Sequence, residues 1–427
     1  MASSPTNAPT RGLGGDFWKF WVGQAISNLG SSFTLFALPL LVYQLTGSAL
    51  NLGLMTAVEF LPYVLFGLVL GAWADRVDRK HMMILTDVAR AAIIASIPLL
   101  AGLDLLLVWW IYAVGFISST LKICFDAGEF AAVPSLVGKD GLIKANGRIQ
   151  ASYSAAFFLG PLLAGALLVL MPVQTILLFD ALSFLASALA LALVTGSFNV
   201  EGADKKTLAT LREDVVEGLR YVLSHPVLRN ISIMMALINF LAATTHSQLV
   251  LFAKERLGAS DSQVGLLYSA GALGVAVLSL AADPVRKRLS FSKAALGALM
   301  LYGLLIFGLA FVTFYWIAVP VWALALGFGI FFNINTSSLR QAIVPNRMLG
   351  RVQSIAAVLA WSAIPLGAFL GGLAIEETQN VALVYGMIGV LVFLVAFAFS
   401  FTALGRAERY LEQEKTPGES EQTSMPS

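Results

Sequence analysis

Long apolar segments recur along the whole chain, and they restrict its fold more than any other feature. Each is close to the roughly 20 residues that a helix needs to cross a bilayer, and each contains few charged residues. Only 12% of the 427 residues are charged, which is too few to cover a water-facing surface. The mean hydropathy of +0.81 agrees with this. We therefore predict an all-α integral membrane protein, because helices satisfy their own backbone polar groups inside lipid.

These segments predict twelve membrane-spanning helices. Their expected limits are 17–43, 49–73, 82–103, 105–125, 146–171, 173–197, 227–252, 262–283, 294–313, 315–337, 350–374 and 380–404. Alternate connections between them carry most of the Lys and Arg residues, as cytoplasmic connections of membrane proteins do. Both termini are therefore expected in the cytoplasm.

The longest polar connection divides the chain into two halves. Within it Leu208, Leu211, Val215 and Leu219 recur at helical spacing, which indicates an amphipathic helix at the membrane surface. The predicted organisation is a disordered cytoplasmic tail at 1–16, a six-helix bundle at 17–197, a linker with this helix at 198–226, a second six-helix bundle at 227–404, and a cytoplasmic tail at 405–427.

Composition also limits the function. The formal net charge of +2 gives no reason to expect nucleic acid as a partner. One cysteine, Cys124, excludes an internal disulfide, and three histidines spread along the chain argue against a metal site. An enzyme is disfavoured because no nucleophile elbow, zinc-binding HExxH sequence or phosphate-binding loop occurs. We expect a monomer without cofactor, whose partners are a small-molecule substrate and membrane lipid.

The two halves resemble each other at a spacing of roughly 210 positions, which indicates an internal repeat. Asn28 in the first expected helix corresponds to Asn239 in the seventh, and Ala132-Val133-Pro134 corresponds to Ile343-Val344-Pro345. Two such bundles related by an axis along the membrane normal enclose a cavity near the middle of the membrane. This layout is typical of a transporter.

Two sequence motifs carry a family resemblance. The segment Gly71-Ala-Trp-Ala-Asp75-Arg76-Val-Asp78-Arg79-Lys80 resembles the loop signature of the major facilitator superfamily, with Asp78 where that pattern usually has glycine. The segment Ala156-Phe-Phe-Leu-Gly160-Pro161-Leu-Leu-Ala-Gly165 resembles the antiporter signature of exporters. Shorter matches, which include Thr46-Gly47-Ser48 and the segment from Asp87 to Arg90, are similar to the bacterial branch that contains macrolide efflux pumps and the enterobactin exporter.

The resemblance implies a gating role for the loop motif. Asp75 would lock the cytoplasmic ends of the two halves together in the outward-open state, supported by Arg79 and Lys80. Physically, a carboxylate at that position can accept hydrogen bonds from the free N–H groups of a neighbouring helix N-terminus. The alternative is an ordinary basic loop that sets only the topology.

Acidic residues inside predicted helices are candidates for proton coupling. Glu59 lies about nine residues into its helix, some 14 Å deep at roughly 1.5 Å per residue, where an ionised carboxylate is costly unless it faces a cavity or a partner. Asp180 is a second candidate, and Asp126 a third. The alternatives are a structural hydrogen bond for Glu59 or Asp180, and mutual neutralisation of Asp126 and Lys122, four residues apart.

Polar residues share single faces of the first helix of each half. Gln24, Asn28 and Ser31 do so in the first helix, and Asn239 and His246 in the seventh. The resemblance places these helices against the central cavity, although polar contacts between helices would give the same pattern. Trp361 and Phe157 are candidates for an apolar cavity wall, or else for ordinary packing.

Glu129 and Arg340 occupy equivalent positions in the repeat, at the cytoplasmic ends of the fourth and tenth helices. We expect them to form a salt bridge in the outward-open state only, or else to be solvated helix ends. Taken together, the sequence favours a secondary exporter of amphipathic small molecules that works by alternating access and uses the proton motive force. The alternative function is a lipid or lysophospholipid flippase, or an uncoupled facilitator.

Overall fold

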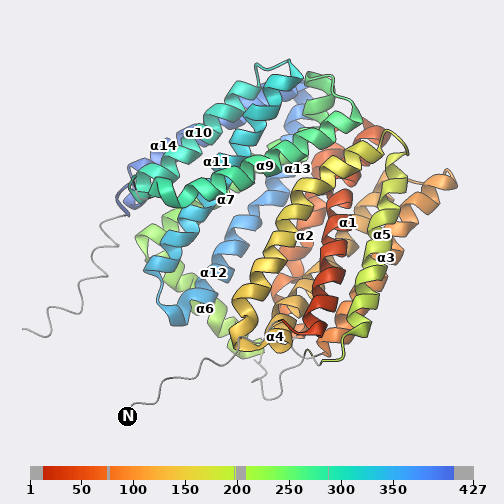
Figure 1. Ribbon diagram of the computed structural model, residues 1–427. Coiled ribbons are helices and arrows are strands. Elements are labelled where there is room, and N and C mark those ends of the chain that lie inside the picture. The colour runs from red at the N-terminus through yellow and green to blue at the C-terminus, as the bar shows by residue number, and fades with distance from the viewer. Residues whose placement is uncertain (1–12, 75–76, 197, 199–207, 287, 408–427) are drawn as a thin grey trace, which may run out of the picture.

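The protein folds almost entirely into helices. The computed structural model describes residues 13–74, 77–196, 198, 208–286 and 288–407, and within these ranges it contains twelve helices long and apolar enough to cross a membrane (Figure 1). The predicted all-α fold with twelve spanning helices is therefore confirmed.

Two groups of helices form the two halves of the molecule (Figure 1). The first half comprises α1 (Gly15–Thr46), α2 (Ala49–Ala74), α3 (Arg79–Gly102), α4 (Val108–Leu167) and α5 (Val173–Leu193). The second half comprises α7 (Pro226–Ser247), α8 (Leu249–Leu251), η1 (Phe252–Arg256), α9 (Asp261–Arg286), α10 (Phe291–Leu309), α11 (Tyr315–Ile343), α12 (Asn346–Trp361), α13 (Ala363–Thr378), α14 (Val381–Ser400) and η2 (Ala403–Arg406). Helix α6 (Leu208–Ser224) lies in the connection between the halves and packs on α12 and α7.

The two membrane sides of the molecule differ in charge. The basic side, as we call it, is the side where α3 begins at Arg79 and where α6 lies. The far side is the opposite one, where α2 begins and α13 ends. The helix termini on the basic side carry Arg79, Lys80, Arg220 and Arg351.

Two helices depart from the expected spans. The fourth and fifth spans are joined in α4, where Gly138 takes a positive φ of 64° that a residue without a side chain adopts easily. The eleventh span is divided at Ser362 into α12 and α13. Pro365 explains this break, because it has no N–H for the carbonyl of Trp361 and its ring crowds that carbonyl.

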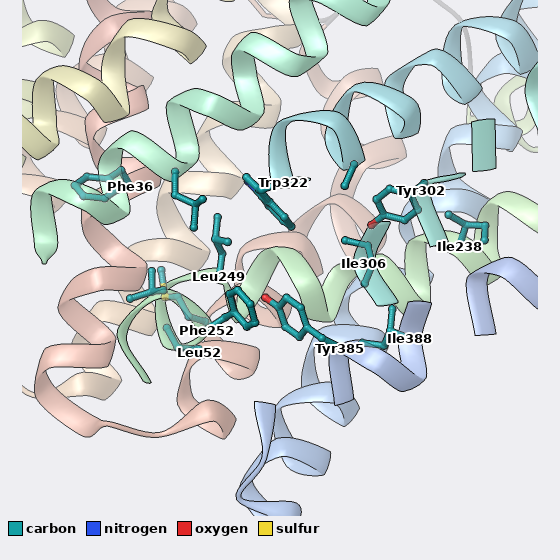
Figure 2. Packing of buried hydrophobic residues seen from close by; sticks show 14 of the residues in the cluster. Phe36, Leu52, Ile238, Leu249, Phe252, Tyr302, Ile306, Trp322, Tyr385 and Ile388 are labelled. Carbon is teal, nitrogen blue, oxygen red and sulfur yellow. The ribbon is translucent and has the colours of Figure 1, made fainter. Parts of the chain in front are cut away.

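A large apolar core extends from one half into the other near the far side (Figure 2). Phe36 and Leu52 of the first half belong to the same cluster as Phe252 and Tyr385 of the second. The rings of Phe252 and Tyr385 stack with centroids 4.6 Å apart, and the Tyr385 hydroxyl donates to the backbone oxygen of Thr245 at 2.8 Å. Burial of these apolar side chains holds the halves together on this side.

Glycine residues allow the two halves to approach closely at the far side. A Cβ at Gly265 of α9 would lie 2.5 Å from the backbone oxygen of Pro161 in α4. A Cβ at Gly372 of α13 would lie 2.7 Å from the backbone oxygen of Ala49 at the start of α2. Larger residues at either position would push the halves apart.

Candidate substrate pathway

A cavity of about 260 Å³ lies within the first half. Helix α1 contributes Gln24, Asn28 and Ser31 to its wall. The other polar or charged residues on the wall are Ser27, Ser32, Thr34, Glu59, Arg90, Ser118, Ser119, Lys122, Asp126, Tyr153 and Asp180. Most of the residues that line this cavity are therefore polar or charged, and apolar side chains such as Leu35 and Leu38 complete its wall.

A second cavity of about 210 Å³ lies within the second half. Asn239 and His246 of α7 line it, together with Tyr302 of α10 and Asn333 of α11. Among the described residues that line it, none is acidic. The side chain of Phe157, from the C-terminal part of α4, borders both cavities and therefore lies at their junction.

Asp180 is the most completely buried acid of the first cavity, with 1% of its surface exposed. Its carboxylate accepts hydrogen bonds from Thr34 of α1 and from Ser183 of its own helix, the latter at 3.2 Å. The bond from Thr34 links α5 to α1. Asp180 therefore makes structural hydrogen bonds, which was the alternative to proton coupling, and it also lines the cavity.

Glu59 and Asp126 occupy different surroundings on the same wall. Glu59 faces Gly115 of α4, where an added Cβ would lie 3.4 Å from the Glu59 Cγ atom. Asp126 accepts a hydrogen bond of 2.9 Å from Lys122, so this acid has a neutralising partner. Among the described residues, no such ion pair is found for Glu59, so the two acids differ in their electrostatic partners.

Helix α3 contributes two more buried charged residues to the first half, one acidic and one basic. Asp87 is fully buried, and Arg90, three residues further, is 7% exposed with its guanidinium carbon 3.9 Å from the ring centroid of Phe184. Arg90 lines the cavity together with its three acids. In the sequence, Asp87 and Arg90 carry part of the family resemblance, and charges in the middle of a spanning helix are also a signal of function.

The polar residues of the second cavity are held by neighbouring helices. Asn239 donates from Nδ2 to the backbone oxygen of Ala360 at 2.9 Å. The His246 ring lies edge-on to Trp322, with centroids 5.7 Å apart. Trp361 lines neither cavity; its ring packs edge-on against Tyr63 of the first half at 6.0 Å.

Glu129 and Arg340 both lie buried, with 8% and 5% of their surfaces exposed, so they are not solvated helix ends. Glu129 accepts a hydrogen bond of 3.2 Å from Tyr153, within the first half. Arg340 donates to Gln353 at 2.9 Å and contacts the sulfur of Met235, within the second half. In this structure each residue therefore has partners in its own half.

The basic residues of the loop motif bind the end of α5. Lys80 donates from Nζ to the backbone oxygen of Val194 at 2.6 Å, and Arg79 donates to that of Phe198 at 3.2 Å. Cations suit this position because the last carbonyls of a helix are free and the helix dipole is negative there. Gly71 lies in α2, whereas Asp75 and Arg76 fall outside the described residues.

Asp78 caps the start of α3. Its side chain accepts a hydrogen bond of 2.8 Å from the backbone N–H of His81, and this bond lowers the pKa of Asp78. The φ of Asp78 is −66°, a value open to any residue, so this turn has no need of the glycine that the family pattern usually places there.

The second motif lies at helix contacts. A Cβ at Gly160 would collide with the side chain of Ser32, so glycine is what lets α4 cross α1 closely. Pro161, the next residue, contacts α9 across the boundary between the halves. Among the described residues, no cluster of His, Cys, Asp and Glu has the geometry of a metal site.

Twelve spanning helices in two bundles, with a cavity inside each, define a membrane transporter of small molecules. The sequence matches the model of the Major Facilitator Superfamily over residues 20–368, and the chain belongs to that family. It is a non-enzymatic, multi-pass membrane transporter.

Relatives and solved structures agree with this assignment. Macrolide efflux protein A of Streptococcus pyogenes is 31% identical over 178 residues, a match that covers 42% of this chain and 44% of that protein, less than half its length. The multidrug efflux pump Tap of Mycolicibacterium fortuitum is 28% identical, with 81% of this chain and 86% of the pump covered. A bacterial homologue of the iron transporter ferroportin in an inward-facing state has the same fold, with a TM-score of 0.73, 18% identity, and coverage of 92% and 100%.

Proposed function

We propose that this transporter exports amphipathic small molecules by alternating access and is driven by the proton motive force. The observation that carries the proposal is the pair of cavities, one in each half, that meet at Phe157. A substrate between the halves would contact both walls, so a rocking motion of one half against the other would expose it to each membrane side in turn.

Drug-like amphipathic molecules fit the chemistry of the two walls. Apolar groups such as Phe157, Leu35 and Leu38 alternate there with hydroxyl, amide and charged groups. Binding sites for small molecules combine such apolar surface with a few polar anchors. The names of the relatives, a macrolide efflux protein and a multidrug efflux pump, support the same substrate class and the outward direction.

Proton coupling is assigned to the first half, because the acids Glu59, Asp126 and Asp180 line its cavity and none lines the other. Removing a carboxylate from water disfavours its ionised form, so the charge of such a group responds to whichever side the cavity faces. Glu59 is the principal candidate, since Asp126 is paired with Lys122 and Asp180 with hydroxyl groups.

Orientation follows from the distribution of basic residues. We place the basic side toward the cytoplasm of a bacterium, with both termini on that side of its cytoplasmic membrane. The cavities lie inside one chain, which supports function as a monomer.

Everted membrane vesicles test the proposal. In these vesicles the basic side faces the medium, so energised vesicles should accumulate a radiolabelled macrolide, and a protonophore should release it. Vesicles from cells that lack the protein provide the background. Accumulation that survives the protonophore would contradict proton coupling, and equilibration without accumulation would indicate a facilitator.

A further inference from the structure

Glu376 of α13 contacts the start of α2 in the other half of the molecule. Its Oε2 atom accepts a hydrogen bond of 3.1 Å from the hydroxyl of Ser48 and one of 3.4 Å from the backbone N–H of Leu50. Ser48 precedes the first residue of α2, and its Oγ atom also accepts a bond of 3.2 Å from the N–H of Asn51. The two halves are thus joined by a carboxylate at a helix N-terminus.

This contact has the chemistry of a helix cap whose acid comes from the other half. The first N–H groups of a helix have no partner within it, and the helix dipole favours a negative charge there. Capping boxes combine a Ser or Thr with a Glu of the same helix for this reason. Here Ser48 belongs to the first half and the glutamate to the second, so the cap exists only while the halves touch.

The contact lies within a group of polar interactions on the far side. Gln248 donates to the backbone oxygen of Ala49 at 2.7 Å, and Gln44 donates to Asp261 at 3.0 Å. For the described residues, these and the two bonds of Glu376 are the hydrogen bonds found between the halves. Glu376 is the acid of this group that accepts a hydrogen bond from an N-terminal N–H of a helix in the other half.

We propose that Glu376 is the latch that holds the far side of the transporter closed. Helices α2 and α13 pack against each other, and the chain runs through them in opposite directions. Glu376 at the end of α13 caps the start of α2, which is the reciprocal of the role that the family resemblance implies for Asp75, the residue that follows Ala74 in the sequence. Glu376 would then stabilise the state with the far side closed, and Asp75 the state with the basic side closed.

The latch rests on the alternating access proposed above. A contact that forms in one state only shifts the balance of states toward it. When the far side opens, the start of α2 and the end of α13 separate, and Glu376 loses both bonds. Removing its charge should therefore favour the conformation with the far side open.

Distance measurements between spin labels test the latch in purified protein reconstituted in lipid nanodiscs. In a Cys124→Ser background, one label pair at Leu170 and Phe314 reports on the far side, and another at Ile143 and Ser224 reports on the basic side. Glu376→Gln is the test variant. Glu377→Gln is the matched control, because Glu377 is the next residue and its side chain is exposed.

We expect Glu376→Gln to raise the far-side-open population several-fold, with longer distances on the far side and shorter ones on the basic side. Ser48→Ala, a second variant, should produce a smaller shift in the same direction, since the bond to the Leu50 N–H remains. Glu377→Gln should match the wild type.

Unchanged distance distributions in both Glu376→Gln and Ser48→Ala, with two states present in the wild type, would overturn the latch. A single unchanging distance in the wild type on both sides, with and without a macrolide and at different pH values, would instead overturn alternating access itself.

Discussion

The Asp180 carboxylate in α5 accepts a hydrogen bond from the hydroxyl of Thr34 in α1, and both residues line the cavity of the first half. This bond gives Asp180 a fixed partner, which Glu59 on the same wall lacks among the described residues. This difference is the reason that the proposed proton coupling is placed on Glu59 and not on Asp180.

Glu59→Gln is therefore expected to abolish accumulation of substrate against a gradient while substrate binding is retained. The amide imitates a carboxyl group that is permanently protonated, so the proton-dependent step of the cycle is lost. Binding of a radiolabelled macrolide to purified protein and uptake by energised vesicles measure the two properties separately. Undiminished uphill transport would assign Glu59 to packing and transfer the coupling role to Asp180 or Asp126.

Phe157→Ala should weaken substrate binding by roughly tenfold, because an aromatic side chain at the junction of the two cavities contributes apolar contact to any molecule that spans them. Phe179→Ala is the matched control, since Phe179 has a similar exposure of 42% but lines neither cavity. Equal binding by the Phe157 variant and the wild type would show that the substrate does not pass this junction.

Asp75→Asn is expected to reduce transport strongly while expression and membrane insertion persist. One acidic charge in a connection has little influence on insertion, whereas a gating contact depends on it. Transport assays and quantification of the protein in membranes check both parts. Near-normal efflux by the variant would remove the gating role that the family resemblance implies.

Glu129→Gln or Arg340→Gln should each shift the balance toward the conformation with the basic side open. The two residues have separate partners here, so the salt bridge predicted between them would form in the opposite state. A contribution of order 1 kcal/mol would change the populations several-fold.

The exchange variant Glu129→Arg with Arg340→Glu should partly restore the balance. Distances between spin labels at Ile143 and Ser224 measure how open the basic side is in each variant. If neither the single variants nor the exchange alters those distances, the two residues act only within their own halves.

Asp78→Ala should lower the free energy of unfolding by about 0.5–2 kcal/mol, because the helix loses its cap. The unfolding temperature should fall with it. The folded protein lowers the pKa of Asp78, so the ionised cap stabilises it above the ordinary Asp value of roughly 3.9 and this contribution is lost as the pH falls through the lowered value. Thermal unfolding of wild type and variant at neutral pH checks the cap. Equal unfolding temperatures would contradict it.

The spanning helices could be predicted because hydropathy and length determine them directly. The acids Glu59 and Asp180 could be found for the same reason, since a carboxylate within an apolar segment needs an explanation. Glu376 could not be recognised in this way. It lies near the end of its helix, where an acid is unremarkable, and only the packing of α13 on α2 brings it to Ser48. The division at Ser362 was also missed, although Pro365 was the local signal.

The central claim, proton-coupled export, is tested most directly by measuring whether protons move across the membrane when the substrate moves. Purified protein in liposomes with a pH-sensitive dye inside is given a substrate gradient and no pH gradient. The account predicts that substrate movement drives protons in the opposite direction, so the internal pH changes for the wild type and not for Glu59→Gln. Substrate movement by the wild type without any change of internal pH would contradict proton-coupled export.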